Sequence, residues 1–167
     1  MIFITMKQEH IHPIPITGAI ITVSTTRTKE TDTSGKTIQA ILTDAKIPVE
    51  YYSVVPDQIE AIRLELYQAL KTCNCIIIDG GTGLTHDDCT IEAIAPLLEK
   101  KIDGFGELFR MKSYDEIGIS TMLSRAIAGT IRGRVVFCVP GSTPAVTLAT
   151  KNLIVPEIPH ILSHANK

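Results

Sequence analysis

The chain of 167 residues is 44% hydrophobic and 20% charged, which allows one domain with a sizeable core and excludes a disordered, collagen-like or heptad-repeat protein. Lys and Arg number 16 and Asp and Glu 18, so the net charge of −2 excludes the basic face that nucleic-acid binding usually requires. The four cysteines lack paired spacing, and apolar runs are far shorter than the ~20 residues of a membrane span. We therefore expect a soluble protein of the reducing cytoplasm, without nucleic-acid or membrane partners.

Two strands and two helices alternate in the first half of the chain. The strands are apolar, β-branched runs, and the helices carry apolar residues every three or four positions. In chain order they are a strand from Gly18 to Ser24, a helix from Lys36 to Ala45, a strand from Ile47 to Val55 and a helix from Gln58 to Leu70. Asp32 or Ser34 is expected to cap the first helix, because short oxygen-bearing side chains bind free backbone N–H groups at a helix start.

The second half continues this alternation. Its expected elements are a strand from Cys73 to Asp79, a helix from Thr90 to Lys100, a small-residue helix from Ser120 to Ala128, a strand from Arg134 to Val139 and a helix from Ala145 to Leu153. Gly104-Phe105-Gly106-Glu107 is expected to interrupt the helical pattern. Residues 1–16 are predicted to form an N-terminal arm, and residues 154–167 a C-terminal tail punctuated by prolines.

Strands that alternate with helices predict a single α/β domain over residues 1–167. Parallel neighbours need crossover connections, so the sheet should be mainly parallel with helices on both faces. The expected fold is a Rossmann-like, three-layer α/β/α sandwich. Mean hydropathy is +0.20 although the chain has four Phe, four Tyr and no Trp, so its hydrophobicity is aliphatic. This excess indicates buried strands and subunit contacts in a homo-oligomer.

The loops after the strands carry residues suited to an anion and a hard cation. In a parallel sheet these loops meet at the carboxyl edge, where ligands of such folds bind. Glycines let backbone N–H groups approach a phosphate, and carboxylates are ligands for Mg²⁺. We therefore predict a site for an anionic ligand with Mg²⁺ at this edge. The candidate residues are Ser24, Asp57, Gly80, Gly81, Thr82, Gly83, Asp88, Pro140, Gly141 and Ser142.

Each of these signals has a structural alternative. The glycine loop from Gly80 to Gly83 also suits a tight strand-to-helix turn without a ligand, and it does not form the dinucleotide pattern G-x-G-x-x-G. An aspartate before a helix, such as Asp57 or Asp88, is often an N-cap, although their joint occurrence opposite the glycine loop favours metal or phosphate chemistry. Ser124-Arg125, expected on a helix, offers a guanidinium either for a phosphate or for an ion pair.

Several motifs in a fixed order are more specific than any one of them. They are Asp79-Gly-Gly-Thr-Gly-Leu-Thr-His-Asp-Asp-Cys-Thr-Ile-Glu-Ala93, Gly104-Phe-Gly-Glu107, Leu123-Ser-Arg125, Ala128-Gly129 and Pro140-Gly-Ser142. This set resembles the MoaB/Mog family of molybdenum cofactor biosynthesis proteins, which is related to the G domain of gephyrin. The resemblance extends from Gly18 to the last helix and is closer to the MoaB branch.

The resemblance implies molybdopterin adenylyltransfer, in which ATP and molybdopterin give adenylylated molybdopterin and pyrophosphate with Mg²⁺ or a similar cation. It also implies a homo-oligomer, a trimer or hexamer, and other cofactor-biosynthesis proteins as partners. Asp57 and Asp88 match two acidic positions tied to catalysis, where they would hold the metal. Positions that line the pterin and nucleotide pocket are matched by Gly80, Gly81, Thr82, Gly83, Ser124, Pro140, Gly141 and Ser142.

Three positions depart from the family pattern. Ser24 is followed by Thr25 where the family often has Ser-Asp, Ile91 stands where proline is common, and Thr143 follows Ser142 where other members differ. Some MoaB-branch members are thought to lack transferase activity. One alternative is therefore an oligomer that binds molybdopterin or nucleotide and stores or delivers the intermediate without chemistry. Another is an unrelated Rossmann-type binder of NAD or S-adenosylmethionine.

Overall fold

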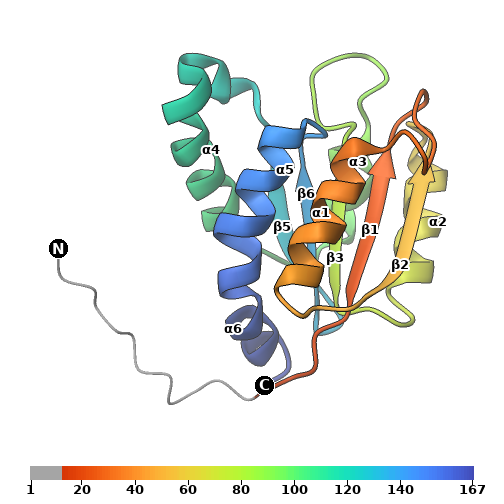
Figure 1. The fold of residues 1–167 in the computed structure, drawn as a ribbon, viewed down its shortest axis with the longest axis vertical. Helices are drawn as coiled ribbons and strands as arrows, with labels where there is room; N and C mark the ends of the chain where they lie inside the picture. Colours follow the sequence, from red (N-terminus) through yellow and green to blue (C-terminus); the bar gives the residue numbers. More distant parts are fainter. Residues whose placement is uncertain (1–12) are drawn as a thin grey trace, which may run out of the picture.

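Six strands form one sheet in the computed structural model, which describes residues 13–167 (Figure 1). The sheet order is β2-β1-β3-β6-β5-β4. The first four strands are parallel to one another, and β5 pairs antiparallel with both β6 and β4. The strands are β1 (Gly18–Val23), β2 (Val49–Val55), β3 (Cys75–Asp79), β4 (Lys100–Lys101), β5 (Ile127–Ile131) and β6 (Arg134–Val139). The mainly parallel sheet that the sequence predicts is confirmed.

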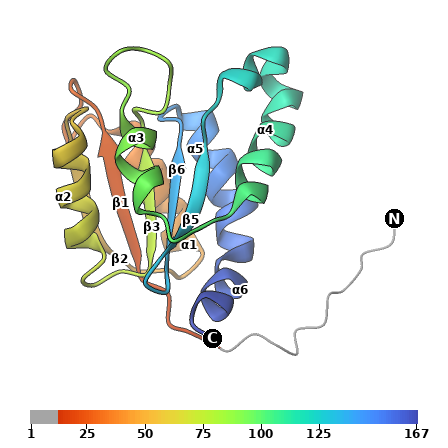
Figure 2. The ribbon, with the colours of Figure 1, turned by 180° about the vertical axis from the view of Figure 1, so that it is seen from behind.

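Helices cover both faces of this sheet, so the predicted three layers are also confirmed (Figures 1 and 2). The α-helices are α1 (Thr33–Asp44), α2 (Ile59–Ala69), α3 (Thr90–Ile94), α4 (Asp103–Ile117), α5 (Thr143–Ala149) and α6 (Val155–Ala165). Short 3-10 helices η1 (Ala95–Leu97) and η2 (Gly118–Leu123) and a π-helical segment η3 (Thr150–Ile154) join them.

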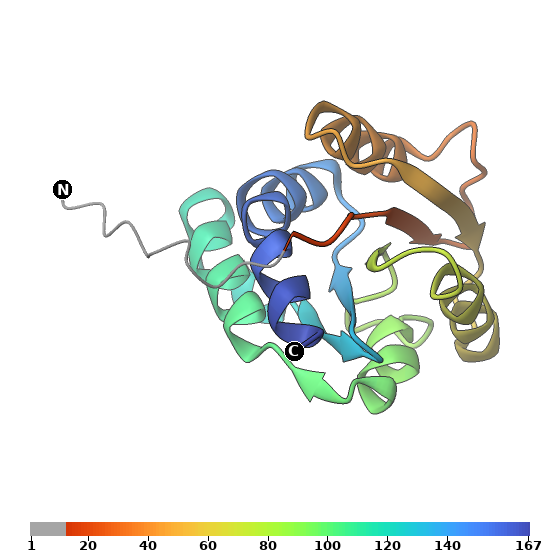
Figure 3. The same ribbon diagram turned by 90° about the horizontal axis from the view of Figure 1, so that it is seen from below.

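Side chains that alternate along the central strands pack into two separate hydrophobic cores, one on each face of the sheet. On β1, Ile20 packs with residues of α1, α4, α5 and α6, whereas its neighbour Ile21 packs with residues of α2 and α3. The view along the strands shows these two groups of helices on opposite sides of the sheet (Figure 3). The first helix follows the sequence prediction, because the Asp32 side chain caps α1 by accepting a hydrogen bond from the Gly35 amide.

The helix predicted from Thr90 to Lys100 is wrong beyond its first turns. Helix α3 ends at Ile94, and the chain continues through η1 into the edge strand β4. Pro96 explains the stop, because proline has no N–H for the helical ladder and its ring clashes with the preceding turn. Lys100 and Lys101, which are therefore not helical, pair with Thr130 and Gly129 of β5.

The helix break expected at Gly104 to Glu107 is also wrong, because these residues form the start of α4. Phe105 and Phe109 are buried in the core, and this packing outweighs the low helix propensity of the two glycines. Gly106 has a packing reason of its own. A Cβ atom there would lie 2.6 Å from the Ala126 carbonyl oxygen, so only glycine allows this close approach.

The small-residue helix predicted from Ser120 to Ala128 is wrong, as is the tail predicted for residues 154–167. The first segment contains the end of η2 and the start of β5, whose small residues allow it to pair closely with β4 and β6. The second forms α6, which buries Ile158 and Leu162 in the core. Pro156 stands in the first turn of α6, a position that proline tolerates in helices.

Candidate functional site

The loops after the four parallel strands meet at one edge of the sheet. Val55 pairs with Val23 and Val139 with Asp79, so the strands end at nearly the same level. The Ser24 amide donates to the Val55 carbonyl oxygen at 2.8 Å, and the Gly80 amide donates to the Val139 carbonyl oxygen at 3.0 Å. The structure thus brings together the loops that carry most of the candidate residues.

The glycine loop has a conformation that other residues adopt only with strain. Gly80 and Gly81 have φ angles of 89° and 63°, and a Cβ atom on Gly80 would lie 2.3 Å from the Val23 carbonyl oxygen. Thr90 at the start of α3 fixes the loop, since its hydroxyl donates to the Gly80 carbonyl and its amide to the Gly81 carbonyl. The two glycines therefore meet a structural requirement, and the loop they form is rigidly placed at the carboxyl edge.

Asp57 and Asp88 do not cap the helices that follow them. The N-cap residues of α2 and α3 are Gln58 and Cys89, and neither uses its side chain as a cap. Both carboxylates instead lie against the glycine loop. A Cβ atom on Gly81 would be 3.0 Å from Oδ1 of Asp57, and one on Gly83 would be 2.6 Å from Oδ2 of Asp88.

The two carboxylates have pKa values shifted in opposite directions. Burial, followed by the negative charge of Asp88, raises the pKa of Asp57. Burial acts on Asp88 as well, but hydrogen bonds from the Thr85 hydroxyl at 2.7 Å and amide at 2.9 Å outweigh it and lower the pKa of Asp88. Asp57 therefore lies in a negative field that a bound cation would neutralise.

A metal ion held by Asp57 and Asp88 would need further ligands that do not come from protein side chains. Within residues 13–167, no group of three or more His, Cys, Asp or Glu side chains could hold a metal ion. Mg²⁺ is usually bound by one or two carboxylates together with water and substrate phosphates. The pair Asp57 and Asp88 fits this mode of binding.

Arg125 contacts the glycine loop, with Ser124 preceding it in the chain, and neither residue is on a helix as the sequence suggests. They follow η2 and precede β5. The Arg125 guanidinium donates to the Thr82 carbonyl at 3.0 Å and forms an ion pair with Glu92 of α3, so the ion-pair interpretation of this residue holds. The buried hydroxyl of Ser124 has no hydrogen-bond partner among the described residues, which leaves it available to a ligand.

The remaining candidates have hydrogen bonds that hold their own loops. The Ser142 hydroxyl caps α5 by accepting from the Ala145 amide at 3.3 Å. The Ser24 hydroxyl accepts from the amides of Thr26 and Arg27, both at 3.2 Å. A Cβ atom on Gly141 would be 3.0 Å from the Gly80 Cα atom, so the loop from Pro140 to Ser142 packs directly on the glycine loop.

A buried polar cluster beneath these loops was not anticipated as part of the site. We define it as the buried residues Thr22, Asp32, Ser34 and Asp79 together with the half-buried Arg27 and Tyr52. Asp79 is fully buried, with its Oδ1 2.6 Å from the Ser34 hydroxyl and its Oδ2 accepting from Thr22 at 2.8 Å. Burial raises the pKa of Asp79 to about 6, against the hydrogen bonds from Ser34 and Thr22 and with a further increase from the charge of Asp32.

Replacing Asp79 by Asn should stabilise the protein above about pH 6 and have little effect near pH 4. The unfolded chain ionises near the ordinary pKa of aspartate, whereas folded Asp79 stays protonated up to about pH 6. The wild type therefore loses up to about 3 kcal/mol of folding free energy as the pH rises through this window, and Asn carries no such charge. Urea unfolding at about pH 4 and pH 8 measures the difference. A stability gap that is the same at both pH values would contradict the burial of a charge at Asp79.

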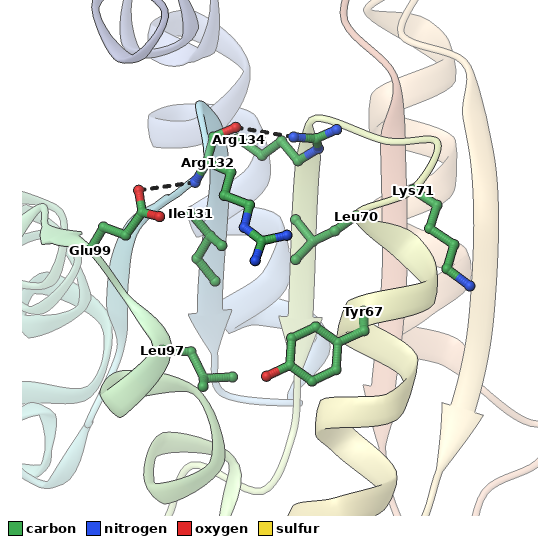
Figure 4. A pocket seen from close by; sticks show the side chains of 8 residues that line it. All are labelled: Tyr67, Leu70, Lys71, Leu97, Glu99, Ile131, Arg132 and Arg134. Atoms are coloured by element: carbon green, nitrogen blue, oxygen red, sulfur yellow. Dashed lines mark hydrogen bonds between the residues drawn. The ribbon is translucent and has the colours of Figure 1, made fainter.

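A large cavity lies elsewhere in the molecule and contains none of the candidate residues. It has a volume of about 580 Å³ and lies between the end of α2, η1 and the turn from β5 to β6. Tyr67, Leu70, Leu97 and Ile131 supply apolar walls, and the Arg132 side chain extends between Ile131 and Leu70 (Figure 4).

None of the helices among the described residues is long and apolar enough to cross a membrane.

Comparison with known proteins places this chain in a family. Residues 19–160 match the family described as "Probable molybdopterin binding domain". The chain belongs to this family. It is 44% identical to the molybdenum cofactor biosynthesis protein B of Staphylococcus carnosus over 168 residues, which cover 96% of this chain and 99% of that protein. The corresponding protein of Bacillus subtilis is 42% identical over 165 residues, with 96% and 97% covered.

Solved structures of family members superpose closely. A crystal structure of a molybdenum cofactor biosynthesis protein B has a TM-score of 0.88 at 46% identity and covers 93% of this chain and 98% of that one. The tungsten cofactor synthesizing protein MoaB from Pyrococcus furiosus has a TM-score of 0.84 at 40% identity, with 93% and 100% covered. The resemblance to the MoaB/Mog family that the sequence motifs indicate is thereby confirmed.

Proposed function

We propose that this protein takes part in molybdenum cofactor biosynthesis by transferring the adenylyl group of ATP to molybdopterin. The observation that supports this most is the pair of carboxylates, Asp57 and Asp88, against a rigid glycine loop in a member of the molybdopterin-binding family. Parallel α/β sheets bind ligands at this edge, and backbone N–H groups of such loops suit phosphates.

Asp57 and Asp88 are the residues that would hold Mg²⁺. When bound, the ion would neutralise negative charge on the phosphates of ATP and so lower the barrier to phosphorus–oxygen bond formation. Burial and then the charge of Asp88 raise the pKa of Asp57, so a cation bound between the two carboxylates would offset both effects.

The reaction needs little proton transfer. An oxygen of the terminal phosphate of molybdopterin forms a bond to the α-phosphorus of ATP, while the bond from this phosphorus to the oxygen shared with the β-phosphate breaks and pyrophosphate leaves. A phosphate nucleophile is already ionised near neutral pH, so the protein acts mainly by positioning the two substrates. We assign the molybdopterin phosphate to Thr82 and the glycine loop, with Ser124 beside them, and the nucleotide to Ser24 and the loop from Pro140 to Ser142.

Pyrophosphate release tests the proposal. Purified protein with molybdopterin, ATP and Mg²⁺ should release pyrophosphate only when all three are present. Tight binding of molybdopterin without pyrophosphate release would instead favour the alternative function, in which the protein stores or delivers the intermediate without catalysing its formation. Binding of NAD or S-adenosylmethionine without binding of molybdopterin would overturn both functions.

We also propose that the protein is a homo-oligomer, a trimer or hexamer, through an apolar surface on α4 and η2. The large apolar side chains of this surface are between 46% and 76% exposed. They belong to α4 and η2, and α4 lies at an outer edge of the molecule in Figure 1. Exposed apolar side chains that gather on neighbouring elements often mark a protein interface. Its residues are Leu108, Met111, Tyr114, Ile117, Ile119, Met122 and Leu123.

Charge placed on this surface should dissociate the oligomer. Met111→Glu together with Ile119→Glu would bury two carboxylates against a sister subunit, and uncompensated burial of charge is costly. We expect the molar mass measured by light scattering to fall to that of one chain. Leu64→Glu is the matched control, because Leu64 is 57% exposed on α2, away from α4 and η2, and this variant should keep the wild-type mass. A wild-type protein that is itself a monomer would contradict the assignment.

A further inference from the structure

The buried polar cluster contains two carboxyl groups and one guanidinium. Asp32 and Asp79 are both fully buried, and Arg27 is the basic side chain that reaches them. The Nη1 atom of Arg27 lies 3.8 Å from Oδ1 of Asp32 and donates to the Ser34 hydroxyl at 2.6 Å. Two buried negative charges with one positive charge leave an uncompensated charge, which is costly in a protein interior. One additional proton makes the cluster neutral.

The hydrogen bonds of Ser34 indicate where this proton lies. A serine hydroxyl has one hydrogen and two lone pairs. Three groups lie around this hydroxyl: Arg27 at 2.6 Å, Asp79 at 2.6 Å and Asp32 at 3.1 Å. Because Arg27 can only donate, an ionised Asp79 and an ionised Asp32 would compete for the single hydroxyl hydrogen. One carboxylate–hydroxyl contact would then contain no hydrogen.

A proton on Asp79 satisfies every one of these contacts. Asp79 then donates to Ser34, and Ser34 donates to Asp32. Asp32 is the better site for the negative charge, because it also accepts from the Gly35 amide at 2.9 Å and the Tyr52 hydroxyl at 2.7 Å. Burial raises the pKa of Asp32, but hydrogen bonding, first from Thr22 and then from Gly35 and Tyr52, outweighs it and lowers this pKa, whereas burial raises that of Asp79.

The cluster is connected to the loop after β6 through Arg27. The same Nη1 atom that binds Ser34 also donates to the Gly141 carbonyl at 3.3 Å. A Cβ atom on Gly141 would lie 3.7 Å from Oδ1 of Asp79, so this loop packs directly over the carboxyl group. The titratable groups that face Asp79 are Arg27 from the loop after β1, Asp32 before α1 and Tyr52 of β2.

We propose that Asp79 is a positioning residue whose bound proton keeps Arg27 bridged between Ser34 and Gly141, and thereby holds the loop from Pro140 to Ser142 in place. Loss of the proton turns the Ser34 hydroxyl toward Asp79 and draws Arg27 toward the added negative charge, away from Gly141. The consequence for nucleotide binding rests on the proposed function, whereas the proton on Asp79 and its effect on the loop do not.

Nuclear magnetic resonance of the full-length protein without ligands tests the proposal. In wild-type protein with ¹³C-labelled aspartate, one carboxyl resonance should titrate near pH 6, about two units above an ordinary aspartate. The amide resonance of Gly141 should shift with the same midpoint. Asp79→Asn should remove both transitions, and Asp44→Asn, at an exposed position near the end of α1, should leave both unchanged.

A second variant separates the proton from its effect on the loop. Ser34→Ala should keep a carboxyl that titrates well above the ordinary range, because Asp79 remains buried, but Gly141 should no longer follow it. This comparison with wild type is decisive even if Asp79→Asn does not fold. The proposal is overturned if every aspartate of the wild type titrates below about pH 5, or if Gly141 shifts in the same way in Ser34→Ala.

Nucleotide binding provides the functional measurement. The dissociation constant for Mg²⁺-ATP should rise as the pH increases through about 6 in the wild type and stay level in Asp79→Asn. Absence of any ATP binding, with the two NMR transitions present, would count against the proposed function and leave the positioning role of Asp79 supported. A dissociation constant with the same pH dependence in both proteins would contradict the link from Asp79 to the nucleotide loop.

Discussion

Asp57→Asn and Asp88→Asn should each reduce the rate of pyrophosphate release by about 100-fold or more, which corresponds to about 3 kcal/mol of lost transition-state stabilisation. Asparagine keeps the shape of the side chain and removes the charge that would hold Mg²⁺. Neither carboxylate caps a helix, and the hydrogen bonds that Asp88 accepts from Thr85 lie within its own exposed loop, so the structural effect of either substitution should stay local. The loss should therefore appear in turnover and in the Mg²⁺ concentration required.

Asp87→Asn is the matched control for this experiment. Asp87 is in the same loop as Asp88 but is exposed to solvent, so its replacement should leave turnover within a few-fold of wild type. Circular dichroism and urea unfolding would verify that all three variants fold. Turnover that survives Asp57→Asn combined with Asp88→Asn would eliminate these residues as metal ligands.

Gly80→Ala should destabilise the protein by about 4 kcal/mol. The φ angle of 89° strains any residue with a side chain, at a cost of about 1 to 3 kcal/mol. The added Cβ would also lie 2.3 Å from the Val23 carbonyl oxygen, so the backbone of β1 or β3 must move. Movement at this place displaces the glycine loop, and any folded variant should have lost most of its affinity for phosphorylated ligands.

Gly104→Ala supplies the comparison. A Cβ atom on Gly104 meets no atom within 4 Å, and the residue is in helix α4, where alanine is favoured over glycine by up to about 1 kcal/mol. Urea unfolding should therefore show Gly104→Ala at or above wild-type stability and Gly80→Ala well below it. Equal stability of the two variants would show that the glycine loop is more tolerant than its geometry indicates.

Strands with continuous apolar sequences could be predicted from the sequence, and those with small residues could not. Runs such as Cys75 to Ile78 indicate a strand buried on both faces, and the structure confirms β3 there. Ala128 and Gly129 of β5 have neither β-branching nor helical periodicity to identify them. Their place in the sheet follows from pairing with β6, a tertiary contact that no local pattern contains.

The same distinction applies to the site. Asp57, Asp88 and the glycine loop could be found because they follow strands, and the topology of a parallel sheet gathers such residues at one edge. The cluster around Asp79 joins residues from three separate segments, and its meaning depends on burial and on a shared proton. The sequence contains one indication of this cluster, because Asp79 is an ionisable residue at the end of an otherwise apolar strand.

Transfer of label from ATP to molybdopterin tests the central claim most directly. With ATP labelled at the α-phosphate, together with molybdopterin and Mg²⁺, the wild-type protein should transfer the label to molybdopterin in an amount equal to the pyrophosphate released. Asp57→Asn should bind molybdopterin and transfer almost none. If the wild type binds molybdopterin tightly and the label stays in ATP, the protein is not an adenylyltransferase.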